Sequence, residues 1–432
     1  THATEGNTQV WCEYTGGLMP RPPPFVNKEH ANKAHSTTTQ RSQDILGAGR
    51  LTVDATTGII DIVESLHNSI HRVGGLLGDA NQTRTSGMTG VVYGTIRKIT
   101  GLIGSGIDSQ LQQPTIPVQN ADSSEQREAL LSVINGIMGD QLVAKNNPLA
   151  IPMQLRAKGK VLDKQSLQKL IRDSNGQIAL MIHGLCMNDL QWQRQGHDHG
   201  EALARELGFT PIYLHYNSGR HIYQNAQDLS ALLDSLLTQA SKPIELSIIA
   251  HSMGGLVSRS AYHYATKDNL SWPAHLKKLV CLGSPHHGAP MEKGGNWIDT
   301  LLKISPYSAP FTGLTQVRSS GITDLRYGHL LEEDRQGKDR FERLPDQRTP
   351  LPLPDDVQCY AVAASIQDDA KAFGEELIGD GLVTVSSALG RHKQEALRLD
   401  FKATHQWIGR NINHMELLSH PEVYKVIKAW LA

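Results

Sequence analysis

The sequence predicts an α/β fold, in which a mostly parallel sheet is flanked by helices. Three observations carry this prediction. An apolar, β-branched run at 246–250 turns abruptly at a serine and continues with helical spacing. Runs typical of buried strands at 177–182 and 357–366 are each followed by a loop that contains glycine. The last part of the chain, 414–431, has apolar residues at the spacing of a helix.

The turn Ala250-His251-Ser252-Met253-Gly254 has the pattern of a nucleophile elbow. In such an elbow a strand turns sharply into a helix around a serine, and small residues two positions before and after it prevent clashes. The usual pattern has glycine at the first small position, where this chain has Ala250. A serine that only caps a helix is the alternative, because serine is a preferred N-cap residue. We interpret Ser252 as the candidate nucleophile.

A second loop is expected beside this elbow. The strand predicted at 177–182 leads directly into His183-Gly184-Leu185. In hydrolases built on an elbow, one oxyanion donor is the N–H after the nucleophile, and the other comes from the loop after an earlier strand. The expected donors are the N–H groups of Met253 and Leu185, and Gly184 would let the loop approach a substrate closely. An ordinary turn that ends a strand is the alternative for the His-Gly pair.

The candidate acid and base follow the serine in the chain. Asp380 lies between two glycines beyond the strand predicted at 357–366, and a carboxylate there can orient a histidine; a simple Asp-Gly turn is the alternative. His414 begins the last helical pattern, from where its ring can reach the nucleophile. The order Ser252, Asp380, His414 is that of the α/β-hydrolase fold. Other candidates for the base and the acid are His251, His392, His405, Asp356 and Asp368.

Five segments together resemble a known family. They are IHGLCMNDLQW, AHSMGGLVSRSA, CLGSPHHGAP, GDGLVTVSSALG and NHMELLSHPEVYKVIKAWL. In combination they are similar to bacterial lipases and esterases of the α/β-hydrolase superfamily, and more narrowly to the GPI inositol deacylase-like branch. The resemblance covers residues 146–432. It implies a triad of Ser252, Asp380 and His414 and an oxyanion hole at Leu185 and Met253. The substrate stays open, since this fold hosts many acyl-transfer reactions.

The resemblance also implies that the loop Leu282–Gly288 lines the site. The predicted substrate-binding residues are His183, Gly184, His251, His286 and Trp297. A metal site at His286-His287 or at His197-Asp198-His199 is disfavoured, because catalytic zinc needs three well-placed protein ligands. The second cluster precedes a helical pattern, where capping explains it. We predict no metal and no cofactor. The loop 216–220 ranks low as a border of the site.

Composition excludes several classes of function. The chain has 432 residues and a formal net charge of −1, so no basic field would recruit nucleic acid. No apolar stretch reaches the roughly 20 residues that a transmembrane helix needs. The first residues show no signal-peptide pattern, which favours a cytoplasmic location without fixing it.

The four cysteines do not indicate a disulfide framework. Cys12 lies in the N-terminal tail. Cys281 and Cys359 lie within apolar strand patterns, where free cysteine behaves as a small hydrophobic residue. Cys186 follows the His-Gly turn and lacks an elbow, which disfavours it as a nucleophile.

Three regions are predicted. Residues 1–41 are polar and proline-punctuated, as in an extended arm, and residues 42–145 have helical spacing with many small residues, as in a helical module. The catalytic domain would span 146–432, with an insertion at 289–354 that forms a lid or a wall of the acyl pocket. The module would pack on the catalytic domain. Peripheral contact with a lipid surface through the module or the lid is the alternative.

The predicted function is hydrolysis of carboxylic esters by a serine hydrolase, as a lipase or carboxylesterase acting on an ester or lipid substrate. Among enzymes, the alternatives are a phospholipid or GPI-type deacylase and an acyltransferase. A hydrolase-fold protein that binds a partner without catalysis is the alternative from another class. The intact serine, acid and histidine argue against that last alternative.

Overall fold

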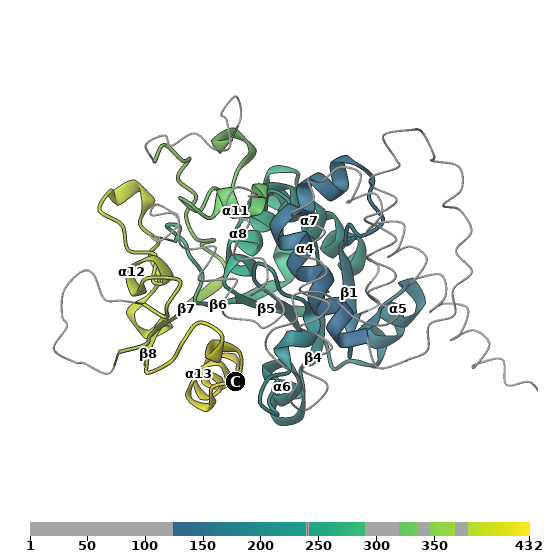
Figure 1. The fold of residues 1–432 in the computed structure, drawn as a ribbon. Helices are drawn as coiled ribbons and strands as arrows, with labels where there is room; N and C mark the ends of the chain where they lie inside the picture. The colour runs from purple at the N-terminus through teal and green to yellow at the C-terminus, as the bar shows by residue number, and fades with distance from the viewer. Residues whose placement is uncertain (1–123, 239, 241, 290–318, 336–345, 368–378) are drawn as a thin grey trace, which may run out of the picture. The chain divides into compact units, whose positions relative to one another are not determined.

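The computed structural model describes residues 124–432 except 239, 241, 290–318, 336–345 and 368–378 (Figure 1). All of the described residues belong to one compact unit, Asp44–Ala432. The predictions for the arm at 1–41, for most of the helical module and for Trp297 lie outside the described residues, as does much of the insertion at 289–354.

A mostly parallel sheet forms the centre of the described chain, in the order β2-β1-β4-β3-β5-β6-β7-β8. Strands β3 to β8 run parallel to their neighbours within that group, whereas β1 pairs antiparallel with β2 and β4. Helices flank the sheet on both sides, so the predicted α/β-hydrolase fold is confirmed (Figure 1). The strands are β1 Gln154–Ala157, β2 Lys160–Val161, β3 Gln177–Ile182, β4 Thr210–His215, β5 Glu245–His251, β6 Leu276–Leu282, β7 Gln358–Ser365 and β8 Gln406–Arg410.

Helices connect most of these strands. The described α-helices are α4 Ser124–Ala144, α5 Lys164–Asp173, α6 His199–Leu207, α7 Ile222–Leu237, α8 Met253–Lys267, α11 Ser320–Asp324, α12 Val385–Ala388 and α13 Pro421–Leu431. Short 3₁₀ turns are η2 Asp189–Trp192, η3 Trp272–His275, η5 Glu332–Asp334, η6 Glu395–Leu397, η7 Ala403–His405 and η8 Glu416–Leu418.

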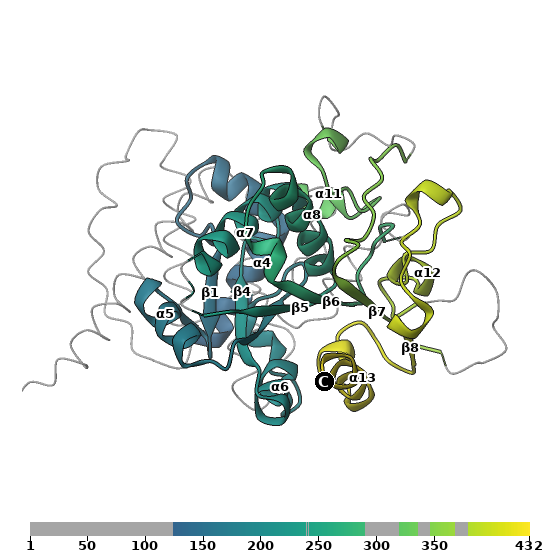
Figure 2. The ribbon, with the colours of Figure 1, turned by 180° about the vertical axis from the view of Figure 1, so that it is seen from behind.

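Both faces of the sheet are covered, because successive side chains of a strand point to opposite faces. In β3, Ile178, Leu180 and Ile182 belong to a core cluster that includes residues of α7 and α8. Ala179 and Met181 belong to a second cluster with residues of α6 and α13. Figures 1 and 2 show these two pairs of helices on opposite sides of the sheet. Burial on both faces explains why β3 and β7 are apolar along most of their length.

The direction in which successive strands are added to the sheet reverses at β3. β4 pairs with one edge of β3, and β5 pairs with the other. In open α/β sheets such a reversal leaves a crevice outside the carboxyl ends of the strands, where ligands bind. The loops after β3 and β5 contain Leu185 and Ser252, so both residues lie at this crevice.

The strands predicted at 177–182, 246–250 and 357–366 are present as β3, β5 and β7. The prediction of one continuous helical pattern over 414–431 is wrong, because η8 is a separate 3₁₀ turn and α13 begins only at Pro421. Proline is well tolerated in the first helical turn but disfavours helical backbone in the residue before it. His414 therefore lies on irregular backbone well before the helix.

The helix predicted at the end of the helical module is present as α4. Its buried residues Val133, Ile137 and Leu142 belong to the same core cluster as α7 and α8. This helix therefore packs directly on the sheet-based fold. The boundary at 145 between module and catalytic domain stays a prediction, since the rest of the module lies outside the described residues.

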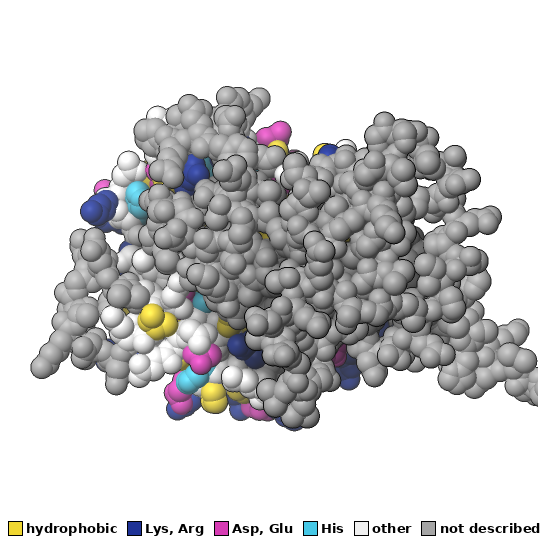
Figure 3. All heavy atoms as spheres, in the orientation of Figure 1, with side chains coloured by type: hydrophobic (Ala, Val, Ile, Leu, Met, Phe, Trp, Pro, Cys, Tyr) yellow, Lys and Arg dark blue, Asp and Glu magenta, His cyan; other side chains and the backbone are white. Residues whose placement is uncertain are grey.

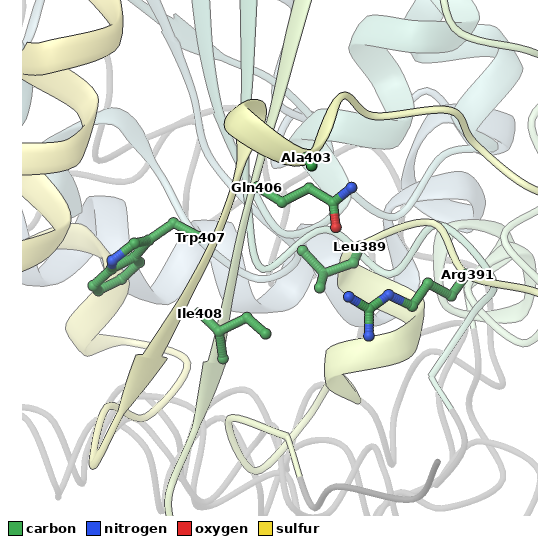
Figure 4. Close-up of a pocket in the computed structure, with 6 residues that line it drawn as sticks. All are labelled: Leu389, Arg391, Ala403, Gln406, Trp407 and Ile408. Carbon is green, nitrogen blue, oxygen red and sulfur yellow. The ribbon is translucent and has the colours of Figure 1, made fainter. Parts of the chain in front are cut away.

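A hollow of about 530 Å³ lies beside β8 at the edge of the sheet (Figure 4). Trp407 extends to the opposite side of β8 from Gln406, as alternation along a strand requires. β6 and β7 separate β8 from β5, so this hollow does not contain Ser252. The hollow is lined by Leu389, Arg391, Ala403, Gln406, Trp407 and Ile408.

The described surface visible in Figure 3 mixes basic, acidic, histidine and apolar side chains, and no single class dominates it. This mixture agrees with the net charge of −1. None of the described helices combines the length and hydrophobicity that a membrane crossing requires.

Candidate active site

Ser252 occupies a strained turn between β5 and α8. Its backbone has φ 54° and ψ −122°, a left-handed conformation that is uncommon for residues other than glycine. The hydroxyl makes no capping hydrogen bond to α8, although the residue stands at the N-cap position. The geometry is therefore that of an elbow and not of a serine that caps a helix. A Cβ at Gly254 would lie 2.6 Å from the carbonyl oxygen of Ile182, so this turn requires glycine there.

Asp380 and His414 form a buried pair. The Nδ1 atom of His414 lies 2.7 Å from Oδ2 of Asp380, and the two residues are each 2% exposed. The other carboxyl oxygen, Oδ1, accepts the backbone N–H groups of Leu382 at 3.0 Å and Val383 at 2.8 Å. The tight loop after Asp380 thus directs two backbone N–H donors to one carboxyl oxygen, and the ring of His414 contacts the other.

This pairing fixes the chemical state of the His414 ring. A carboxylate only accepts hydrogen bonds, so Nδ1 carries the proton and a neutral ring keeps a lone pair at Nε2. Both residues are described, and no hydrogen bond joins Nε2 of His414 to Oγ of Ser252. Such bonds are often long in free enzymes and tighten when substrate binds. The ring lies close to the elbow. A Cβ built at Gly283 would be 3.2 Å from Cε1 of His414, and the N–H of Ser252 donates to the carbonyl oxygen of the preceding residue, Leu282, at 2.8 Å.

The loop after β3 lies against the elbow. A Cβ at Gly184 would be 2.9 Å from Cβ of Ser252 and 3.4 Å from its Oγ. The backbone N–H groups of Leu185 and Met253 have no acceptor among the described residues, although both side chains are buried. Buried backbone donors are rarely left unpaired. Two such donors on either side of a serine hydroxyl are suited to bind an oxygen that develops negative charge.

His251, the residue before Ser252, contacts the backbone of His414. Its Nε2 is 3.0 Å from the carbonyl oxygen of His414, and the two ring centres are 4.6 Å apart. Because a carbonyl only accepts, Nε2 of His251 carries the proton. Burial and then His414 hold the pKa of His251 well below its usual range, so the ring is neutral. His251 thus supports the backbone of His414, and its role in binding substrate stays a prediction.

His183 supports the other loop. Its ring stacks on Tyr216 at 4.4 Å, and Nδ1 lies 2.8 Å from the carbonyl oxygen of Gly184. Complete burial lowers the pKa of His183 to about 3. These contacts order the His-Gly turn, and a contact of His183 with substrate stays a prediction.

His286 lies further along the fold, beside α8. Its Nδ1 is 3.3 Å from a guanidinium nitrogen of Arg259, and its ring packs at 5.5 Å from Phe401. None of these described contacts involves Ser252, Asp380 or His414. Its substrate-binding role stays a prediction, and the prediction for Trp297 lies outside the described residues.

The competing candidates have other partners. Nδ1 of His405 lies 3.2 Å from the carbonyl oxygen of Cys359, and the ring of His392 is 4.9 Å from that of His287. Asp356 accepts the hydroxyl of Tyr262 at 2.8 Å, and Asp368 lies outside the described residues. In the part of the chain that the structure describes, the histidine that contacts a buried carboxylate beside the elbow is His414.

Two further predictions concern cysteine and metal. Cys186 is buried, and burial raises the pKa of its thiol to about 12, so it is not a thiolate at neutral pH. Asp198 caps α6 by accepting the N–H of Glu201 at 3.0 Å, as the sequence predicts for the His-Asp-His cluster. Within the described residues, no group of three or more His, Cys, Asp or Glu side chains is arranged to hold a metal ion.

The low rank of loop 216–220 understates its importance. The Oγ of Ser218 accepts the N–H of Cys186 at 3.0 Å, and Tyr216 donates its hydroxyl to the carbonyl oxygen of His183 at 2.9 Å. Both bonds hold the loop after β3. The signal in the sequence was the position of Asn-Ser-Gly directly after an apolar run, since carboxyl ends of neighbouring parallel strands meet at one edge.

Comparison with known proteins gives partial matches. A family model described as a domain of unknown function (DUF7379) matches residues 152–316. No curated protein matches the chain. Among solved structures, the chain is similar to the mature lipase BlEst2 of Bacillus licheniformis, with 16% identity, a TM-score of 0.41, and coverage of 65% of this chain and 98% of that chain.

Two other solved structures are similar. EstA of Clostridium botulinum has 11% identity and a TM-score of 0.36, with 70% of this chain and 97% of that chain covered. The phospholipase PlaB of Legionella pneumophila has 15% identity and a TM-score of 0.34, with 49% of this chain and 45% of that chain covered. The assignment of the fold rests on the order and direction of the strands.

Proposed function

We propose that this protein is a serine hydrolase that cleaves carboxylic esters, as a lipase or carboxylesterase, with Ser252, His414 and Asp380 as its triad. The observation that carries the proposal is the buried pair of His414 and Asp380, 2.7 Å apart, at the same crevice as the elbow serine. The N–H groups of Leu185 and Met253, which have no acceptor among the described residues, support it, since an acyl-transfer site needs donors for an oxyanion.

In the first half of the reaction, Ser252 Oγ attacks the ester carbonyl carbon while its proton passes to Nε2 of His414. The carbonyl electrons move to oxygen, and the N–H groups of Leu185 and Met253 stabilise the resulting oxyanion. Asp380 stabilises the imidazolium and holds its orientation. When the tetrahedral species collapses, the bond to the alcohol oxygen breaks, and that oxygen takes the proton from His414.

In the second half, water attacks the acyl-serine ester. His414 accepts a proton from the water as the new bond forms, and returns it to Ser252 Oγ when the carboxylic acid leaves. All groups that move protons or stabilise charge belong to the chain, so this chemistry requires no cofactor. An acyltransferase would follow the same steps with an alcohol in place of the water.

A fluorophosphonate probe tests the reaction class. We expect it to label Ser252, identified by peptide mass spectrometry, and to block hydrolysis of p-nitrophenyl esters. The control is Ser271→Ala, an exposed serine whose hydroxyl contacts Asp234, which should leave labelling intact. Absence of labelling in a folded wild-type protein would overturn the proposal in favour of a binding protein.

A panel of substrates tests the ester class. It should compare p-nitrophenyl esters of increasing acyl length, triglycerides below and above the concentration at which they form an interface, and phospholipids. Activation by an interface would identify a lipase, and preference for short soluble esters would identify a carboxylesterase. Dominant release of fatty acid from phospholipid would favour the deacylase, to which the GPI inositol deacylase-like resemblance points.

A further inference from the structure

Helix α4 contacts the loop after β3 through its backbone. A Cβ at Gly136 would lie 2.9 Å from both Cα and N of Cys186 and would collide with its Sγ. Contact of this kind is possible only because position 136 has no side chain. Cys186 directly follows Leu185, the proposed oxyanion donor. The helix therefore rests on the peptide unit next to the one that would bind the oxyanion.

Cys186 itself is held in an uncommon conformation. Its φ of 59° is left-handed, which a residue with a side chain adopts only when its surroundings enforce it. One of these constraints is the bond from its N–H to Ser218 Oγ at 3.0 Å. The other is the close approach of the α4 backbone at Gly136, which leaves no space for Cys186 to move toward the helix.

The same helix also fixes the loop that carries Ser218. Nδ2 of Asn217 donates to the carbonyl oxygen of Gly139 at 3.0 Å. A Cβ at Gly219 would collide with the carbonyl oxygen of Asn135. α4 has non-helical backbone at Met138, with φ −139° and ψ 20°, between these contacts. Ser319 also binds this part of α4, since its Oγ donates to the carbonyl oxygen of Gly136 at 2.6 Å.

A second attachment joins the first half of α4 to the far end of the oxyanion loop. Nη1 of Arg156 in β1 lies 2.9 Å from Oε2 of Glu128 in α4 and 3.1 Å from Oδ1 of Asp189 in η2. His215 lies between the same two carboxylates, at 3.6 Å and 3.2 Å. Asp189 is 4% exposed, and the side chains of Arg156 and Glu128 are 11% and 18% exposed, so solvent screens this partly buried contact less than a surface pair. The loop from 184 to 189 is thus fixed to α4 near both of its ends.

We propose that α4 positions the oxyanion hole, with Gly136 and Glu128 as positioning residues that fix the N–H of Leu185. Neither residue touches the substrate; both act through the loop. This inference rests on the proposed function. It assigns to a helix outside the predicted catalytic domain a part in the rate of the reaction and not only in stability.

The test is Gly136→Ala, with activity measured per active site after titration with a fluorophosphonate. Since loss of one oxyanion donor costs about 10²–10³ in kcat, a displaced donor should lower kcat about 10–100-fold with little change in KM. The affinity of an aryl boronic acid, whose tetrahedral adduct occupies the oxyanion hole, should fall in parallel. A purely structural role would reduce the number of titrated sites and leave kcat per site and boronate affinity unchanged.

Leu142→Ala is the matched control. Leu142 is buried in the last turn of α4, and none of the contacts described above involves it. Truncation there should cost about 2–5 kcal/mol of stability and leave kcat per site within about two-fold. Cys186→Gly should rescue part of the kcat of Gly136→Ala, because it removes the colliding Sγ and tolerates the positive φ.

Glu128→Gln keeps the test decisive if Gly136→Ala does not fold. It preserves shape while removing the charge that Arg156 and His215 contact, and should lower kcat per site about 2–10-fold with a parallel loss of boronate affinity. Unchanged kcat and boronate affinity in the folded variants would overturn the role of α4 while leaving the proposed function standing. A wild-type protein that the fluorophosphonate does not label would overturn both.

Discussion

Two buried histidines, one near the start of α8 and one beside its middle, have neighbours of opposite charge. His414, close to the elbow that begins the helix, is paired through Nδ1 with the carboxyl group of Asp380. His286, further along the helix, is paired through Nδ1 with the guanidinium of Arg259 at 3.3 Å. The rings are both about 2% exposed, so burial does not distinguish them. The charge of the hydrogen-bond partner distinguishes them.

The partner sets which ring nitrogen carries the proton. Asp380 accepts a hydrogen bond, so His414 has its proton on Nδ1 and a lone pair on Nε2, as a general base requires. Arg259 only donates, so His286 accepts at Nδ1 and has its proton on Nε2. In the described part of the chain, that nitrogen is buried and has no hydrogen-bond partner. In the proposed mechanism, the chemistry of the neighbouring side chain, and not the place of the histidine in a motif, decides which ring can act as the base.

The largest effect that tests this contrast is expected at the nucleophile. Ser252→Ala should lower kcat for a p-nitrophenyl ester by at least about 10⁴-fold, because the residual rate depends on the oxyanion donors alone. Ser271→Ala, at an exposed serine whose hydroxyl contacts Asp234, is the matched control. Comparable losses in the two variants would show that the elbow is not the centre of the reaction.

The next effect concerns the carboxylate. Asp380→Asn should lower kcat about 10⁴-fold, since an amide can donate to Nδ1 and so favours the tautomer that His286 already has. Asp356→Asn removes the charge of the carboxyl group that accepts the Tyr262 hydroxyl, which has no contact with His414, and should leave kcat within about two-fold. Steady-state kinetics and circular dichroism of both variants separate catalysis from folding. A fully active Asp380→Asn variant would place the acid elsewhere.

A smaller effect is expected in stability against pH. Burial and then Arg348 lower the pKa of His287, which neighbours His286, to about 3, and burial lowers that of His199 to about 3 as well. In the unfolded chain a histidine titrates near 6.5, so below that pH the unfolded state binds more protons. Stability is therefore full above about pH 7 and falls as the pH drops toward 3.

Urea denaturation at about pH 7.5 and about pH 5 measures this dependence. Each such histidine should cost about 2 kcal/mol of unfolding free energy at the lower pH. His287→Gln should reduce the difference in unfolding free energy between the two pH values by that amount. An equal pH dependence in wild type and His287→Gln would show that His287 is protonated in the folded state.

The sequence predicted the parts of this picture that depend on local pattern. The strand before Ser252 and the small residues around this serine are short-range features of the sequence. Ser252 and Asp380 each follow a strand, as predicted. The contacts of His286 and Gly136 could not be predicted, since they join segments far apart in the chain. Arg259 lies within the elbow segment, yet nothing local indicates which histidine it contacts. The last helix is shorter than predicted, because the prediction followed the apolar spacing from His414 onward and not the helix start that Pro421 indicates.

The smallest effect is the one that isolates the partner's role. His286→Gln keeps an acceptor for Arg259 and should change kcat by less than about three-fold, because a ring protonated at Nε2 cannot accept the serine proton. His414→Gln, the same substitution at the carboxylate-paired ring, should lose about 10²–10⁴ of the rate. A rise in KM alone for His286→Gln would support its predicted contact with substrate. If kcat fell equally in both variants, the tautomer that Arg259 imposes would not decide which histidine acts as the base.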